Sequence, residues 1–369
     1  GGAERRGQLA RRIVLSMPFL FDGTRIYRAL KESHLVRSNA PEELLKSSAQ
    51  NRARSDRHEQ YQARPAQVAP TAVAARAIAF YLPQFHTIPE NDEWWGKGFT
   101  EWTKVRPSTP KFEGHNQPHV PGELGYYDLR SDTHVMQRQA ELAKRHGISG
   151  FCFYFYWFGG KTLLETPIEN YSKDESIDFP FCLCWANENW SRRWDGRDND
   201  ILIQQAHSSS DDLDFIRHIS KYLKDPHYIR VDGRPLLLVY RPSLLPDAKE
   251  TAQRWREYAR QSGIGELYLA YTQSFETVDP SIYGFDAAIE FPPNNSGLEP
   301  QSNLVTESAE AKGLNINDWN HLVKRRDNYT QPEFKLFRGV TPSWDNTPRR
   351  PKTGAVMLGS EPDKYGRWL

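Results

Sequence analysis

The chain contains a series of apolar runs, each about as long as a β-strand, that show no polar face. Between them lie segments whose apolar residues recur at helical spacing. Strands that are apolar on both faces and alternate with helices pair in parallel and are buried on both sides. The predicted strands are 77–83, 150–157, 181–186, 235–241, 267–272, 287–291 and 337–342, and the predicted helices include 131–146, 210–224, 247–262 and 316–325. This alternation restricts the body of the chain to an α/β fold.

Two α/β architectures fit this pattern, a TIM-like (β/α)₈ barrel and a doubly wound open sheet. The first strand is not followed by a Gly-x-Gly-x-x-Gly motif, which weakens the dinucleotide-binding form of the open sheet. Clusters of polar and aromatic residues follow the strands, in the order YLPQFH, FYWFGG, WANENW, YRP, YTQS, EFPPNN and TPSWDN. Barrel enzymes build their sites at this edge, so we expect the barrel.

The count of predicted strands is one short of the eight that a closed barrel needs. The residues after Asp345 end in DKYGRWL, which reads as the opening of a helix rather than an eighth strand. We therefore expect a barrel domain over residues 76–369 that lacks its last βα unit.

Residues 1–75 differ from this body. Residues 40–75 are rich in Ala, Arg, Gln, Ser and Pro, as in a linker or frayed helix, and residues 8–37 hold too few apolar residues for a core of their own. We expect an N-terminal helical and linker extension, either the tail of an upstream domain or an arm packed on the body.

The formal net charge of +1 is unevenly distributed along the chain. Residues 1–76, the front, are basic, with 14 Lys and Arg against 7 Asp and Glu, and the body that follows is mildly acidic. The body gives no electrostatic reason to bind nucleic acid, whereas the front could contact phosphates, acidic lipid at a membrane surface, or only water. No apolar run approaches the roughly 20 residues of a membrane-spanning helix.

Cys152, Cys182 and Cys184 all lie in apolar runs. This predicts buried thiols in a reducing compartment, hence a cytoplasmic location. A metal on Cys182 and Cys184 is disfavoured because no second pair of ligands lies nearby. We expect no metal and no other cofactor.

The run FCLCWANENWSRRWDG, residues 181–196, indicates the chemistry most directly. A packed core would leave its amides, carboxylate and guanidinium groups unsatisfied. Sugars suit it, because their apolar faces lie on indole rings and their hydroxyls need polar partners. The predicted ligand contacts in this run are Trp185, Asn187, Trp190, Arg193 and Trp194. Glu188 is a candidate acid or base, with an ion pair to Arg192 or Arg193 as the structural alternative.

The ends of two other predicted strands supply further predicted ligand contacts at the same edge of the barrel. They are Tyr81, Gln84, His86, Trp95, Glu101 and Trp102 in or after the end of the first strand, and Tyr156 and Trp157 at the end of the second. Glu290 and Asp345 complete the set of candidate catalytic carboxylates. The structural alternatives are a salt bridge from Glu290 to a neighbouring loop and a pair between Asp345 and a nearby arginine. Asp198 and Asp200 have the Asp-x-Asp spacing by which glycosyltransferases hold a divalent ion.

Several ordered segments resemble the WbsX-like proteins of polysaccharide biosynthesis loci, which are similar to the endo-α-mannosidases of glycoside hydrolase family 99. These are AFYLPQFHTIPENDEWWGKGFTEWTKV, GFCFYFYWFGG, WANENWSRRWDG, FDAAIEFPP and TPSWDNTPRR. The resemblance implies a (β/α)₈ barrel and a glycan-directed role, often beside glycosyltransferase domains in one long chain. In the family, an Asn-Glu-Trp-Ala-Glu-Gly stretch carries two glutamates that match the catalytic pair of the endo-mannosidases, and this sequence lacks it.

Three functions are compatible with these features. The first is glycoside hydrolase-like acid/base chemistry on a bacterial surface polysaccharide, such as a lipopolysaccharide O-antigen. The second is a nucleotide-sugar glycosyltransferase. The third is a glycan-binding module without turnover, which the missing glutamate pair favours.

Overall fold

The computed structural model describes residues 75–192, 197–297 and 311–369, and the predicted extension lies outside these ranges except for its last residue. The described part is built on seven strands that pair in chain order. These are β1 (Ala77–Tyr81), β2 (Ile148–Phe158), β4 (Phe181–Trp185), β8 (Arg234–Val239), β9 (Tyr268–Gln273), β10 (Ala287–Glu290) and β12 (Leu336–Phe337). Every neighbouring pair on this path is parallel.

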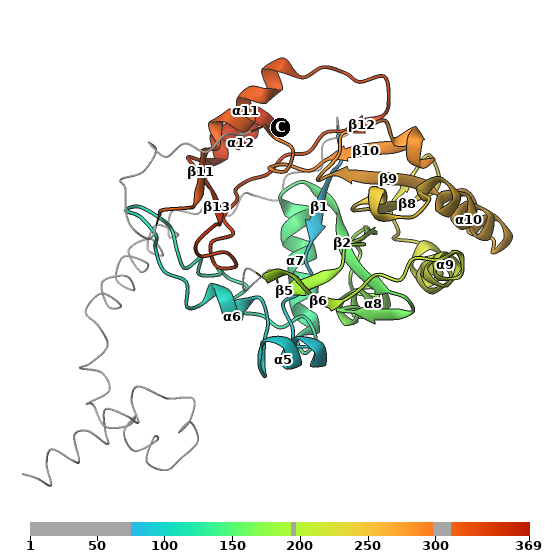
Figure 1. Cartoon of the computed structure of the whole chain (residues 1–369), viewed down its shortest axis with the longest axis horizontal. Coiled ribbons are helices and arrows are strands. Elements are labelled where there is room, and N and C mark those ends of the chain that lie inside the picture. The colour runs from blue at the N-terminus through green and yellow to red at the C-terminus, as the bar shows by residue number, and fades with distance from the viewer. Residues whose placement is uncertain (1–74, 193–196, 298–310) are drawn as a thin grey trace, which may run out of the picture. The chain divides into compact units, whose positions relative to one another are not determined.

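The strand order identifies the architecture. A doubly wound sheet reverses its order at a switch point, whereas these strands follow one another without reversal. The sheet is therefore a partial (β/α) barrel, and the predicted fold class is confirmed. Within the described residues β12 and β1 do not pair with each other, so the half-barrel is open between them (Figure 1).

Four helices follow strands of the sheet, namely α7 (Thr133–Arg145), α8 (Thr166–Lys173), α9 (Ser209–Leu223) and α10 (Ala248–Gln261). The sequence fixes the start of two of them by side-chain caps. The Ser208 hydroxyl accepts a hydrogen bond from the Asp211 amide, and Asp247 accepts one from the Glu250 amide. The predicted helices 131–146, 210–224 and 247–262 agree with α7, α9 and α10 to within two residues.

The register of the strands assigns each side chain to one of two faces. Phe80 pairs with Cys152 and Tyr154 with Cys184, whereas Phe155 pairs with Trp185. Because partners in register point to the same side of a sheet, the first two pairs share one face and Phe155 and Trp185 share the other. Trp185 stacks on Phe215 of α9 at 4.4 Å, so its side is the helix-facing one and the opposite side is the lumen.

Aromatic rings fill the lumen. Phe80 of β1 contacts Phe291, which follows β10, at 4.9 Å between ring centres. Tyr240, which follows β8, contacts Phe291 at 5.5 Å and Tyr154 at 6.1 Å. The interior of the half-barrel is therefore a packed aromatic floor rather than a pore.

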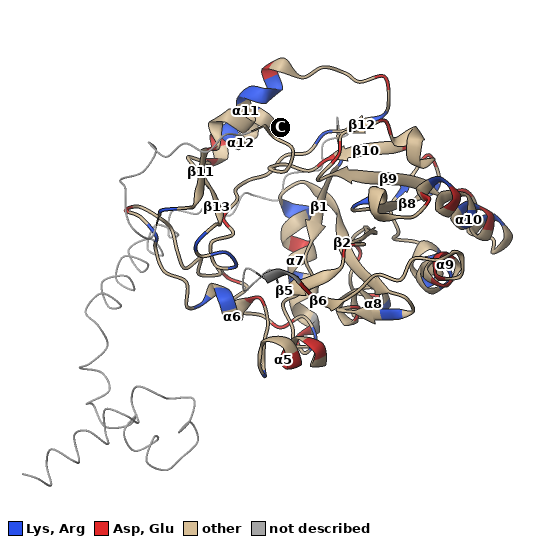
Figure 2. Ribbon diagram, viewed as in Figure 1, with Lys and Arg blue, Asp and Glu red and all other residues tan. Residues whose placement is uncertain are grey.

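Charge is excluded from the central strands. β2, β4 and β9 contain no Lys, Arg, Asp or Glu, and Figure 2 shows both signs of charge on the helices and the connecting loops. Charged groups are rarely buried without partners, so this distribution follows from a sheet that is covered on both faces.

Shorter elements surround the strand ends. They are α5 (Pro89–Trp95), α6 (Trp102–Val105), β3 (Lys161–Leu163), the hairpin of β5 (Trp190–Arg192) with β6 (Arg197–Ile203), β7 (Arg230–Val231), η4 (Pro242–Leu244) and η5 (Pro280–Tyr283). β7 and β8 are antiparallel neighbours joined by Asp232 and Gly233, both of which have positive φ. Such a turn suits an Asp-Gly pair.

The last part of the chain departs from the prediction. Residues 316–318 belong to β11 (Asn315–Asp318), which pairs with β13 (Ala355–Leu358), and only Asn320–Arg325 form a helix, α11. A short 3₁₀ turn, η7 (Arg326–Asn328), and the C-terminal helix α12 (Pro362–Trp368) complete the described elements. The fully buried Trp319 packs with Leu322, Met357 and Trp368 in a separate small core. This local packing overrides the helical spacing of 316–318.

None of the helices in the described ranges combines the length and apolarity required to cross a membrane.

Candidate functional site

Side chains from three strand ends and two long loops form a polar cluster at the mouth of the half-barrel. We call it the mouth cluster and define it as Gln84, Glu101, Tyr156, Trp190 and Arg349. The Gln84 amide donates to the Tyr156 hydroxyl at 2.9 Å, and Arg349 donates to both carboxylate oxygens of Glu101 at 2.7 and 3.2 Å. The Trp190 ring packs edge-on against Tyr156 at 5.1 Å.

The ionisable groups of the mouth cluster influence one another's pKa values. Burial raises the pKa of the Glu101 carboxyl, and the neighbouring Arg349 guanidinium opposes the rise. Burial also raises the pKa of the Tyr156 phenol, on which the charges of Arg349 and Glu101 both act. The cluster therefore offers a neutral hydroxyl and an amide beside a held ion pair, which are the groups that bind sugar hydroxyls.

A second polar group lies where β4 and β8 end. The Arg241 guanidinium donates to Glu188 at 2.9 Å and lies 4.0 Å from the centre of the Phe275 ring. Asn187 is fully buried and exchanges two hydrogen bonds with the Arg241 backbone, at 2.8 and 2.9 Å. Asn187 therefore fixes one strand end to the next, and the Glu188 side chain, which is 20% exposed, is presented beside Arg241.

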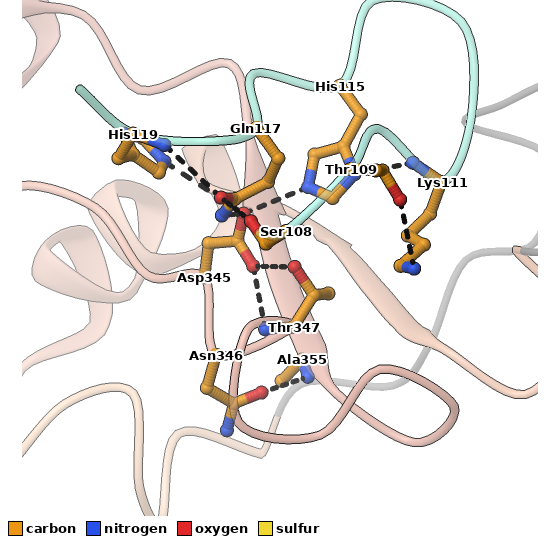
Figure 3. A network of polar contacts seen from close by, with 10 residues as sticks. All are labelled: Ser108, Thr109, Lys111, His115, Gln117, His119, Asp345, Asn346, Thr347 and Ala355. Carbon is orange, nitrogen blue, oxygen red and sulfur yellow. Dashed lines mark hydrogen bonds and ion pairs between the residues drawn. The ribbon is translucent and has the colours of Figure 1, made fainter. Parts of the chain in front are cut away.

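Asp345 is the centre of a third network, shown in Figure 3. One of its carboxylate oxygens accepts from His115 at 2.9 Å and from Gln117 at 2.6 Å. The other accepts from the amide and hydroxyl of Thr347 at 2.9 and 2.7 Å. Burial opposes ionisation, but the donors His115, Gln117 and Thr347 prevail and lower the pKa of Asp345 to about 2. Asp345 therefore holds two loops together as a carboxylate, and it cannot serve as an acid at neutral pH.

Glu290 lies on the other side of the sheet from the lumen. It pairs in register with Gln273, while the adjacent Ile289 pairs with Thr272. Because Phe291 points into the lumen, Glu290 points away from it. Its oxygens accept from Arg338 at 2.8 Å and from the Gly339 amide at 3.1 Å. Glu188, Glu290 and Asp345 therefore belong to three separate networks, and the predicted catalytic set does not share one basin.

Comparison with known proteins assigns the family. Residues 77–369 match the family described as "Glycosyltransferase WbsX". The chain belongs to the WbsX family. Uncharacterized protein WxcX of Xanthomonas campestris pv. campestris is 54% identical over 303 residues, which cover 81% of this chain and 43% of that protein. The chain thus spans less than half the length of the curated relatives it matches.

One solved structure supports the fold, and a second is similar at a lower score. A glycoside hydrolase-like protein superposes with a TM-score of 0.50 and 14% identity, covering 84% of this chain and 83% of that one. A family 99 endo-alpha-mannosidase from Bacteroides thetaiotaomicron reaches a TM-score of 0.40 and 15% identity, covering 75% and 72% of the two chains. The first likeness supports the partial barrel fold of this WbsX-family domain.

Three aromatic residues predicted to contact a ligand lie instead on the helix-facing side. Trp185 is fully buried and donates to the Trp157 carbonyl, and Trp157 donates to Asp211 of α9 at 2.7 Å. Tyr81 donates to Gln139 of α7 at 2.5 Å. The prediction is wrong for these three residues, because a strand that is apolar on both faces gives no alternation from which to tell the inner side chains from the outer ones.

Among the predicted contacts after β1, some are packed within the protein and others belong to the mouth cluster. His86 is fully buried and burial lowers its pKa, so it is a neutral core residue rather than a glycan donor. Trp102 donates to the Tyr127 carbonyl at 2.8 Å and packs on Phe85, while Trp95 packs against Phe99. Gln84 and Glu101 are the two predicted contacts after β1 that lie with Tyr156 in the mouth cluster. Arg193 and Trp194 lie outside the described residues.

Arg241 and Arg349 were not among the predicted contacts, although both hold predicted carboxylates. The sequence contained a signal for each, because YRP and TPSWDNTPRR follow strand ends. Their partners lie 53 and 248 residues away along the chain, so the pairings could not be inferred from spacing.

Proposed function

We propose that this domain binds an oligosaccharide of a bacterial surface polysaccharide at the mouth of the half-barrel and makes or breaks a glycosidic bond there. Membership of the WbsX family supports a glycan-related function. The observation that carries the proposal is the arrangement of Glu188 and the mouth cluster at the carboxyl ends of parallel strands, which is where barrel enzymes act.

In this proposal Glu188 transfers the proton, because it lies at the carboxyl end of β4 beside Arg241, whereas Asp345 accepts from four donors and Glu290 points to the outer face. Arg241 fixes the position of the Glu188 side chain through its hydrogen bond of 2.9 Å. Gln84, Tyr156 and the Glu101–Arg349 pair orient sugar hydroxyls, and Trp190 provides an indole edge. A glycosidase-type step also needs a second carboxylate.

The test uses the protein with a panel of surface oligosaccharides, with binding followed by calorimetry and products followed by mass spectrometry. Glu188→Gln keeps an acceptor for Arg241 but cannot exchange the proton. We expect it to reduce turnover by about 10²-fold or more, with affinity changed only severalfold. The matched control is Glu276→Gln, in the loop that follows β9, which should leave turnover unchanged. Absence of glycan binding by the unaltered protein would refute the proposal.

A second candidate function is glycan binding without turnover. It is favoured by the saturated hydrogen bonding of Asp345 and the outward direction of Glu290, which leave Glu188 alone among the three predicted catalytic carboxylates. In that case the unaltered protein binds an oligosaccharide, no product forms, and Glu188→Gln changes affinity alone.

We also infer that the domain works within a longer protein and in a reducing compartment, consistent with cytoplasmic location. The chain spans 43% of its curated relatives, and Cys152, Cys182 and Cys184 are free and buried. Cell fractionation of the natural full-length protein tests the location.

A further inference from the structure

A cavity of about 360 Å³ lies on the outer face of the half-barrel, away from the lumen. Its wall includes Gln273, Glu290 and Arg338 at the ends of β9, β10 and β12, together with Arg325, Asn328 and Tyr329. The last three belong to α11 and the connection that leads from it to β12, which Figure 1 shows as a long segment. The volume is within the range of pockets that hold small ligands.

The two arginines in this wall have different partners. Arg338 is bound to Glu290 at 2.8 Å, and its guanidinium carbon lies 4.0 Å from the centre of the Tyr329 ring. Arg325 donates to the Ser296 hydroxyl at 3.2 Å and has no carboxylate partner within the described ranges. One carboxylate therefore faces two guanidinium groups, and the wall carries one uncompensated positive charge.

The neutral groups of the wall suit a sugar. Asn328 and Gln273 bring side-chain amides, and Tyr329 brings an aromatic face. Guanidinium groups bind carboxylate and phosphate oxygens through paired, charge-assisted hydrogen bonds. A ligand that carries both hydroxyls and an anionic group would satisfy the charge on Arg325 and the amides together.

We propose that this cavity binds the anionic group of an acidic sugar, with Arg325 as its principal charge partner and Arg338 held ready by Glu290. The site is distinct from the mouth cluster, because Gln273 and Glu290 point away from the lumen. The choice of a sugar as the carrier rests on the proposed function, whereas the choice of an anion rests on Arg325 and Arg338 alone. The anion is a carboxylate or a phosphate.

Calorimetric titration with glucuronate, glucose 1-phosphate and glucose separates these possibilities. We expect at least one anionic sugar to bind at least tenfold more tightly than glucose, and its affinity to fall with added salt. The preferred probe identifies the group as carboxylate or phosphate. If neither anionic sugar binds more tightly than glucose, the proposal is overturned.

Two neighbouring arginines provide the matched variants. Arg325→Gln should weaken binding of the preferred probe at least tenfold. Arg326→Gln should change it less than twofold, because Arg326 bonds the Arg367 carbonyl and Asp327 and does not line the cavity. Equal losses in the two variants would contradict the assignment. Glu188→Gln should leave this binding intact, so failure at the mouth and failure at the cavity give different results.

Discussion

The two faces of the central sheet are both aromatic, but they use their rings differently. On the helix-facing side, Trp157 and Trp185 are almost completely buried and their indole N–H groups bond within the protein. On the lumen side, Tyr156 contributes its hydroxyl to a polar cluster at the mouth. Trp185 and Trp190 are five residues apart, yet one belongs to the core and the other to the rim. Tyr156 and Trp157 are adjacent in β2 and point to opposite faces, so the side of the pleat determines the role of an aromatic residue more than its residue type does.

The largest expected effect comes from removing a helix-facing ring. Trp185→Ala deletes an indole packed between Phe215 and Trp255, so it should lower the free energy of unfolding by about 3 to 5 kcal/mol. Denaturant unfolding followed by circular dichroism measures this loss.

The matched change on the rim is Trp190→Ala, which removes a partly exposed ring. Its cost should be clearly smaller, at about 1 to 2 kcal/mol, because less apolar surface is lost from the core. If the two substitutions cost the same, the distinction between core and rim tryptophans is wrong.

An intermediate effect is expected at Asp345. Its pKa of about 2 in the folded protein lies below the ordinary value of 3.8, so its stabilising contribution is present above pH 3.8 and is lost as pH falls through about 2. Asp345→Asn should therefore cost about 2 kcal/mol at neutral pH, since each pKa unit corresponds to about 1.4 kcal/mol. Unfolding free energies of both proteins at several pH values measure the difference.

The difference between the two proteins should shrink as the pH is lowered from 3.8 toward 2. The control is Asp327→Asn, because Asp327 is largely exposed and its ion pair with Arg326 is long, at 3.5 Å. A difference at Asp345 that is independent of pH would mean that packing, and not ionisation, explains its cost.

The smallest effect on stability should accompany a clear effect on binding. Tyr156→Phe removes the hydroxyl that accepts from Gln84, at a cost of about 1 kcal/mol in unfolding free energy. Loss of one sugar contact of that size should weaken oligosaccharide binding roughly fivefold to tenfold. Calorimetry with the best-bound oligosaccharide measures it.

Tyr171→Phe is the control for the opposite face. It removes a hydrogen bond to the Phe179 carbonyl beside the helices, and it should lower stability to a similar extent without changing affinity. Equal losses of affinity in both variants would show that the lumen and helix faces do not differ in function.

The sheet was predictable from sequence, whereas the partners at its edge were not. Strands buried on both sides are continuous apolar runs, so β2, β4 and β9 stand out from their surroundings. A continuous apolar run does not show which of its side chains face the lumen and which face the helices. For this reason Tyr81, Trp157 and Trp185 were predicted on the wrong side. The structural alternative for Glu188 was a pair with Arg192 or Arg193, and its pair with Arg241 across two strand ends was not foreseen, because only the folded chain creates that contact.

The Asp345 network and the Glu101–Arg349 pair have one effect in common. Each joins the loop after β1 to the loop after β12, the first and last strands of the open sheet. Within the described residues, carboxylates rather than backbone ladders span that gap. Acidity should therefore weaken these contacts across the seam in order, first at Glu101, whose pKa is raised by burial, and last at Asp345, whose pKa is about 2.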